Sequence, residues 1–149
     1  MRFLALIAAA LLGLSGCSIS QDKATAEAGV ALFRQQLASG RYQEIYRSSG
    51  PEFRGTGSEE AGARFLQTVH ERLGAVRNAR QTGWRVNFNS GGSAAVLNYE
   101  TEFARGRGTE EFVFRLADGE STLIGYHINS DALRSGSSPA APAHADKPQ

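Results

Sequence analysis

Four stretches in the second half of the chain alternate between large apolar residues and polar residues. These stretches are Trp84–Asn89, Ala95–Phe103, Glu110–Leu116 and Thr122–Ser130. Successive side chains of a strand point to opposite faces, so this period of two predicts strands with one apolar and one polar face. An antiparallel sheet can be buried on one face and hydrated on the other. The chain is therefore expected to contain a four-stranded antiparallel meander.

The apolar positions define the predicted inner face of this sheet. They are Trp84, Val86, Phe88, Leu97, Tyr99, Thr101, Phe103, Phe112, Phe114, Leu116, Ile124, Tyr126 and Ile128. Glycines lie between the stretches, where chain reversal needs positive φ, and Asp118-Gly119 is the most specific of these turn signals. None of the inner positions is Asp, Glu or His, so no acid–base residue is expected inside the curve of the sheet.

The first half of the chain has helical periodicity instead. A helix is expected over Ala24–Ser39, where Val30, Phe33 and Leu37 share one face. A short second helix is expected over Tyr42–Arg47. Helices followed by strands indicate an α+β fold, with N-terminal helices packed on one face of a curved four-stranded antiparallel sheet.

A third helix is expected to end at Leu73, and both Thr56 and Ser58 are candidates for its N-cap. Thr56 has Glu59 at the capping-box spacing, whereas Ser58 has no Glu or Gln three residues on. The apolar stripe of this helix consists of Phe65, Leu66, Val69 and Leu73. The preceding Phe53 is expected to pack on the core. The segment Ala75–Gly83 is interpreted as a connector with an edge-strand tendency.

The N-terminus has the composition of an export signal. After Met1-Arg2, the apolar run Phe3–Leu14 is too short for a membrane span. It ends in Leu14-Ser15-Gly16-Cys17, which resembles the bacterial lipobox; an ordinary signal peptide with an incidental cysteine is the alternative. The resemblance implies that Cys17 becomes the lipidated N-terminal residue. Ser18 after it favours the outer membrane, facing the periplasm.

These signals divide the chain into four parts. They are a signal peptide (1–16), the lipidated Cys17 with a tether (17–23), one domain (24–132) and a disordered tail (133–149). The single cysteine excludes an intrachain disulfide and a Cys-rich metal site. The chain has 16 basic and 15 acidic residues, and one of the basic residues, Arg2, lies in the leader. This balance gives no indication of a nucleic-acid partner.

Several short motifs resemble a family of bacterial envelope lipoproteins of unknown function with a cystatin-like or NTF2-like fold. The matching segments are Gly40–Tyr46, Phe65-Leu66, Leu73-Gly74, Tyr99–Phe103, Glu110–Phe112 and Gly125–Ile128. The resemblance covers the predicted domain and implies the fold without catalytic residues. Cystatin inhibitors use a Gln-x-Val-x-Gly hairpin loop. The segment Gln67–Glu71 lacks its glycine and has a helical pattern, so protease inhibition is not expected.

The histidines and hairpin arginines are the candidates for polar chemistry. His127 falls on the polar face of the sheet, on the same face as Glu100, Glu102 and Glu111. Such a group could perform acid–base work or be a hydrated cross-strand pair. The remaining candidates are His70 on the helix surface, His144 in the tail, and Arg105 and Arg107 at a hairpin tip that could hold an acidic partner. The scattered histidines have no metal-ligand spacing, and no metal or cofactor is expected.

Five aromatic residues are the candidate lining of a concave pocket. They are Trp84, Tyr99, Phe112, Phe114 and Tyr126. Helix side chains could instead fill this space as ordinary core. Two functions remain open. One is a non-catalytic interaction module that docks another envelope protein by its sheet edge or exposed sheet face. The other is a binder of a small hydrophobic ligand or, less favoured, an isomerase-type enzyme. The oligomeric state is not indicated.

Overall fold

A computed structural model describes residues 17–89 and 92–134 of the chain. The elements follow the order α1 (Cys17–Ala38), α2 (Tyr42–Ser48), α3 (Pro51–Arg54), α4 (Glu59–Leu73), β1 (Val76–Asn89), β2 (Gly92–Phe103), β3 (Gly106–Ala117), β4 (Glu120–Asn129) and α5 (Asp131–Arg134). The predicted leader, His144 and most of the predicted tail lie outside the described residues. Within the described part, no helix is both long and apolar enough to cross a membrane.

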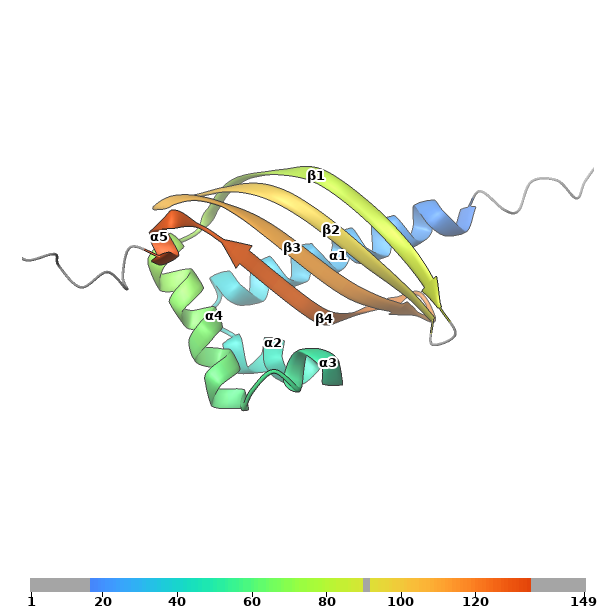
Figure 1. The fold of residues 1–149 in the computed structure, drawn as a ribbon, viewed down its shortest axis with the longest axis horizontal. Helices are drawn as coiled ribbons and strands as arrows, with labels where there is room; N and C mark the ends of the chain where they lie inside the picture. The colour runs from blue at the N-terminus through green and yellow to red at the C-terminus, as the bar shows by residue number, and fades with distance from the viewer. Residues whose placement is uncertain (1–16, 90–91, 135–149) are drawn as a thin grey trace, which may run out of the picture.

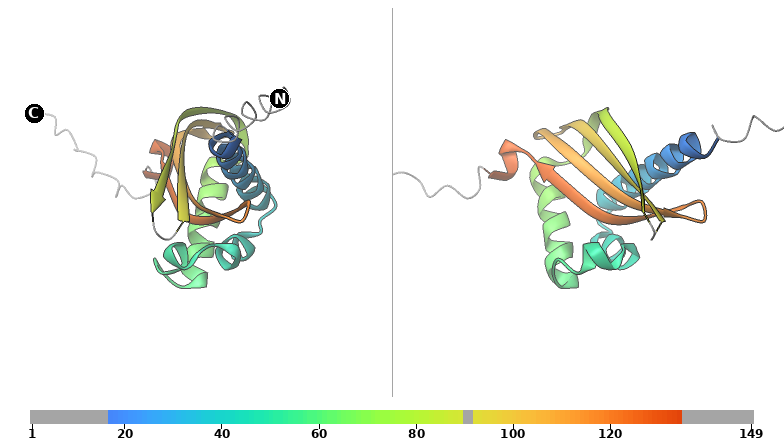
Figure 2. Two further views of the ribbon diagram at one scale, coloured as in Figure 1. Left: turned by 90° about the vertical axis from the view of Figure 1, so that its right-hand side faces the viewer. Right: turned by 45° about the vertical axis from the view of Figure 1, so that its right-hand side comes forward.

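The four strands form one antiparallel sheet in the order β1-β2-β3-β4. The sheet arches over α1, which runs along its concave side, while α4 lies at one end and α2 and α3 lie beyond β4 (Figure 1). Figure 2 shows the same curved sheet beside α1 from two further sides. The predicted α+β architecture of helices on a curved four-stranded antiparallel sheet is confirmed.

Helix α1 is longer than expected, because residues 19–23, interpreted as a tether, are part of it. Its core side follows the expected spacing, and Val30, Phe33 and Leu37 are buried. At the other end of the chain, Leu133 belongs to α5 and packs against the core, although the disordered tail was expected to begin there.

The start of α4 distinguishes between the two N-cap candidates. Ser58 is the N-cap, and its side chain accepts a hydrogen bond from Ala61 N. Thr56 Oγ1 instead donates to the carbonyl oxygen of Phe53, at 2.7 Å. Phe53 is buried in the core, as expected, and it belongs to a short helix, α3, that was not predicted. Phe65 was expected on the apolar stripe of α4, but its side chain is exposed.

Three register shifts change the strands from the simple alternating pattern. Strand β1 begins at Val76 rather than Trp84, and its pairing with β2 shifts near Arg77 and Thr82. A β-bulge inserts an unpaired residue and interrupts the period of two, which explains why a connector was expected here. A third shift lies in β4, so that Leu123 pairs with Phe114 and is buried, whereas Ile124, which was expected on the inner face, has no partner in the register.

The predicted turn at Asp118-Gly119 is confirmed by its backbone. Asp118 has φ 53° and Gly119 has φ 77°. Positive φ at both central residues is the requirement of the tight hairpin turns that match the twist of paired strands. The turn joins β3 to β4 in direct register, since Ala117 pairs with Glu120.

Candidate functional site

The concave side of the sheet is filled by side chains of α1. Tyr99, Phe112, Phe114 and Tyr126, four of the five predicted pocket residues, are buried there. The ring centroid of Phe33 lies 5.2 Å from that of Phe112 and 4.6 Å from that of Tyr126. Phe33 thus occupies the space that the predicted pocket required. A cavity of about 90 Å³ remains between α1, α2 and the β3–β4 hairpin.

Trp84, the fifth predicted pocket residue, lies on the expected face but is not buried. It pairs with Leu97 in the sheet, and Leu97 pairs with Phe112, so the three share the inner face. Trp84 is nevertheless 40% exposed, because β1 is an edge strand. The Nζ atom of Lys23 lies 5.9 Å from the centre of its ring.

A carboxylate is buried among these aromatic rings, contrary to the expectation that the inner face would hold none. Glu110 is 2% exposed. It accepts hydrogen bonds from Arg34 Nη2 at 2.8 Å, from Thr101 Oγ1 at 2.5 Å and from Tyr126 Oη at 2.9 Å. Glu110 has the same parity along β3 as Phe112. Extending the alternation by one pair of residues would therefore have placed it inside.

Arg34 connects this carboxylate to α1. Its side chain is 19% exposed, and its guanidinium lies 4.7 Å from the ring centre of Tyr99 and 5.7 Å from that of Phe112. The Nε atom of Arg34 is buried and has no hydrogen-bond partner among the described residues. A buried charge is expensive unless it is paired and hydrogen-bonded, so Arg34 and Glu110 each make burial of the other tolerable.

The phenols of the network are held in their neutral form. Burial, followed by the charge and hydrogen bond of Glu110, raises the pKa of Tyr126 well above its ordinary value. Burial is also the main reason that the pKa of Tyr99 is raised. Tyr126 therefore donates a hydrogen bond to Glu110 across the normal pH range. The network joins α1, β2, β3 and β4, which suits a structural role.

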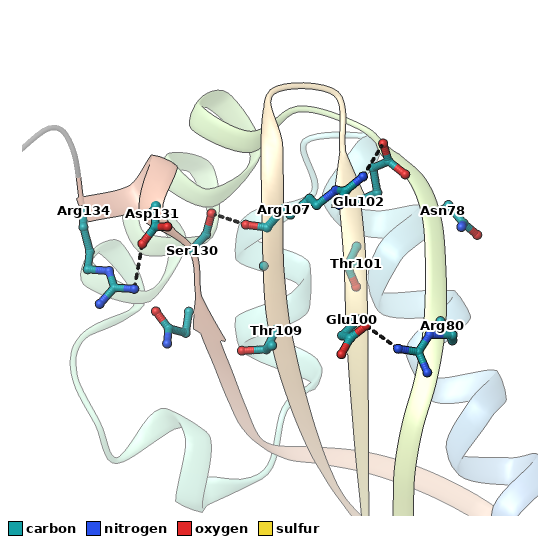
Figure 3. Close-up of a pocket in the computed structure, with 12 residues that line it drawn as sticks. Asn78, Arg80, Glu100, Thr101, Glu102, Arg107, Thr109, Ser130, Asp131 and Arg134 are labelled. Atoms are coloured by element: carbon teal, nitrogen blue, oxygen red, sulfur yellow. Dashed lines mark hydrogen bonds and ion pairs between the residues drawn. The ribbon is translucent and has the colours of Figure 1, made fainter.

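The outer face of the sheet carries an open groove of about 440 Å³ (Figure 3). Its lining comes from β1, β2, β3, the end of β4 and α5, and the residues are Asn78, Arg80, Glu100, Thr101, Glu102, Arg107, Gly108, Thr109, Asn129, Ser130, Asp131 and Arg134. Three ion pairs lie along it.

These ion pairs give the groove both signs of charge in equal number. Arg80 and Glu100 lie 2.5 Å apart across β1 and β2, and more than half of each side chain is exposed. Arg107 and Glu102 lie 3.9 Å apart. The third pair, in α5, joins Arg134 to an aspartate at 2.9 Å. Water screens such exposed pairs, so their groups can exchange partners at little cost.

The two histidines of the described chain lie in different surroundings. His127 is exposed on the outer face and pairs with Glu111 in the strand register, as expected. His70 was expected at the surface, but it is half-buried, and its Nδ1 lies 2.8 Å from Tyr42 Oη. Within residues 17–89 and 92–134, no three His, Cys, Asp or Glu residues are grouped so as to hold a metal ion.

The two hairpin arginines make contacts in different parts of the molecule. Arg105 was considered for an acidic partner, but it donates hydrogen bonds to carbonyl oxygens of α4: Arg72 at 3.1 Å, His70 at 3.3 Å, and Glu71. A cation at the C-terminal end of a helix satisfies free carbonyls and complements the helix dipole. Arg107 instead belongs to the groove.

Comparisons with known proteins support the fold alone. No family model and no curated protein sequence matches the chain. A protein from Catenulispora acidiphila, whose structure was determined at 2.5 Å resolution, is similar to it with a TM-score of 0.53 and 19% sequence identity. The match covers 80% of this chain and 98% of that one. At this identity, the shared architecture carries no information on activity.

Proposed function

We propose that the protein is a non-catalytic, lipid-anchored interaction module of the bacterial envelope that docks another envelope protein in the groove on its outer sheet face. The observation that carries this proposal is the groove itself, of about 440 Å³, lined by exposed and exchangeable charges. The lipobox resemblance at Cys17 supports anchoring at the outer membrane, through acyl chains rather than through the polypeptide.

The charge of the groove favours a protein segment as the occupant. Three arginines and three carboxylate residues line it, namely Arg80, Arg107, Arg134, Glu100, Glu102 and Asp131. Nucleic acid would require a clear excess of positive charge. A polar polypeptide that carries both signs can replace the internal ion pairs with intermolecular ones, and such complementarity gives specificity more than affinity.

The alternative of a small hydrophobic ligand on the concave side has less support. Phe33 packs against Phe112 and Tyr126 where such a ligand would lie. An isomerase-type reaction would also need an acid–base group in an open cavity, whereas Glu110 is enclosed and engaged in three hydrogen bonds.

Docking in the groove is tested by photo-crosslinking in cells. A photoreactive residue at Thr109, in the groove lining, is expected to give an adduct of defined mass. The same residue at Arg64, exposed on α4, is the control and should give none. Arg107→Glu should abolish the Thr109 adduct by placing a third carboxylate beside Glu100 and Glu102. Equal labelling at both positions, or none at either, contradicts docking in the groove.

The lipid anchor is tested separately by Cys17→Ala. The substituted protein is expected to be released to the soluble periplasmic fraction or to remain as an uncleaved precursor, as cell fractionation and the mass of the chain would show. Normal processing together with retention at the membrane would show that Cys17 is not the anchor.

A further inference from the structure

The end of the molecule that contains the start of α1 exposes large apolar side chains. Phe88 is 68% exposed and Trp84 is 40% exposed, both on the inner-face side of β1. Ile19 is also exposed and precedes Lys23 by one helical turn, so it lies next to the residue that contacts Trp84. The C-terminal end of β1 and the first turns of α1 lie at the same end of the molecule (Figures 1 and 2).

The helix brings this apolar end close to the residue proposed to carry lipid. Helix α1 begins at Cys17 itself, so no flexible tether separates Cys17 from the helix. At about 1.5 Å per residue, the axial distance from Cys17 to Lys23 is about 9 Å. Trp84, in contact with Lys23, therefore cannot move far from a membrane that holds Cys17.

We infer that Trp84 and Phe88 insert into the interfacial layer of the phospholipid membrane to which Cys17 is anchored. The inference rests on the lipid anchor of the proposed function. Each polar interface of a bilayer is roughly 5–8 Å thick, comparable with the reach set by the helix. Tryptophan is enriched in this layer, where its ring is partly buried and its N–H stays hydrated.

The surrounding charge favours hydrophobic insertion over attraction to anionic lipid. Lys23, beside Trp84, is paired with Glu27 on its own helix. The neighbouring β3–β4 turn contains Asp118 and Glu120. With no excess of positive charge, binding should depend little on ionic strength, unlike that of a polybasic patch.

Insertion by this end would also orient the groove. The groove is lined by the first part of β1, the start of β3 and α5, and these lie at the opposite end of the molecule from the tip of β1 (Figure 1). A domain seated on Trp84 and Phe88 therefore presents the groove away from the membrane, where an envelope protein can reach it.

The inference is tested with the full mature protein, purified in its acylated form and reconstituted in phosphatidylcholine liposomes. Trp84 is the single tryptophan of the chain and therefore reports on its own surroundings. The expected result is a blue-shifted emission, loss of quenching by iodide, and quenching by lipids brominated on their acyl chains. High salt should leave all three unchanged.

Two substitutions of exposed apolar residues distinguish insertion at this end from non-specific hydrophobic adsorption to the liposome. Phe88→Ser is expected to weaken quenching by brominated lipid and to restore quenching by iodide. Leu32→Ser is the matched control and should change neither, because Leu32 is similarly exposed but lies about 22 Å along α1 from Cys17. Equal effects of the two substitutions would overturn the inference.

The failure of insertion and the failure of the anchor give different results. Flotation of the liposomes and the mass of the N-terminal peptide report on acylation of Cys17. If the acylated protein floats while Trp84 stays accessible to iodide, insertion is refuted and the anchor stands. If the chain carries no acyl group, both proposals are refuted.

Discussion

Replacement of Glu110 by alanine is the sharpest test of how α1 is held on the sheet. The carboxylate accepts hydrogen bonds from Arg34, Thr101 and Tyr126. A hydrogen bond to a charged group contributes about 1.5–3 kcal/mol, and breaking a buried ion pair by removing one partner costs about 3–5 kcal/mol. Arg34 is 19% exposed and keeps some access to water. The expected loss in the free energy of unfolding is therefore about 3–4 kcal/mol.

Urea unfolding followed by circular dichroism measures this loss. With an m value of about 2 kcal/mol/M, the midpoint should fall by about 1.5–2 M at unchanged m. Total stabilities of single domains are about 5–15 kcal/mol, so the variant should still fold but with a much smaller margin.

Glu100→Ala is the matched control on the opposite face of the same sheet. Glu100 also forms an ion pair with an arginine, but more than half of its side chain is exposed, and such pairs contribute about 0–1 kcal/mol. If Glu110→Ala lowers the midpoint no more than Glu100→Ala does, the network does not hold the helix on the sheet.

Three further predictions test separate features of the fold. The pKa of Tyr126 is raised chiefly by burial, so the free energy of unfolding should hold its full value below about pH 10 and fall above it. The fall should be at most about 1.4 kcal/mol per pH unit for each such phenol. Tyr126→Phe should make this fall less steep in urea titrations at alkaline pH. Gly29→Ala should lower the thermal midpoint, because its methyl group would lie 2.8 Å from Cε1 of Phe114 and the overpacking, about 1–3 kcal/mol, exceeds the gain in helix propensity of about 1 kcal/mol. Ser58→Ala should cost about 1 kcal/mol in thermal unfolding and Thr56→Ala less, and equal losses would contradict the N-cap assignment.

The alternation of side chains was sufficient to predict the architecture but not the limits of the strands. A period of two identifies which residues share a face only while the register is unbroken. The shifts near Arg77 and Thr82 break it within β1, and the first part of the strand therefore resembled a connector. A bulge depends on pairing with the neighbouring strand, so nothing in the bulged segment alone reveals it.

The buried network shows a different limit of sequence analysis. Glu110 lies two residues before Phe112, and this spacing indicates that both side chains point to the inner face. Isolated carboxylates rarely lie in a core, however, so the inner face was taken to begin at Phe112 and Glu110 was treated as the end of the strand. Its partner Arg34 lies four residues after Val30 and three before Leu37, beside the apolar stripe of α1. Helical spacing places an arginine near a core face, but it cannot say which carboxylate of a distant strand will meet it.

Replacing both charged residues of this network distinguishes its contribution to stability from its contribution to a unique position of α1. Methionine at Arg34 with leucine at Glu110 removes the desolvation cost of two charges, and such replacements are often neutral or stabilising. The double variant should therefore recover much of the stability lost in Glu110→Ala, although the hydroxyls of Thr101 and Tyr126 lose their acceptor. The contacts that Phe33 of α1 makes with Phe112 and Tyr126 are apolar and much less directional than the ion pair. If the ion pair fixes the rotation of α1 about its own axis, the backbone amides of α1 should exchange hydrogen faster in the double variant, while the amides of β3 stay protected. Unchanged protection of α1 would show that apolar packing alone sets the position of the helix.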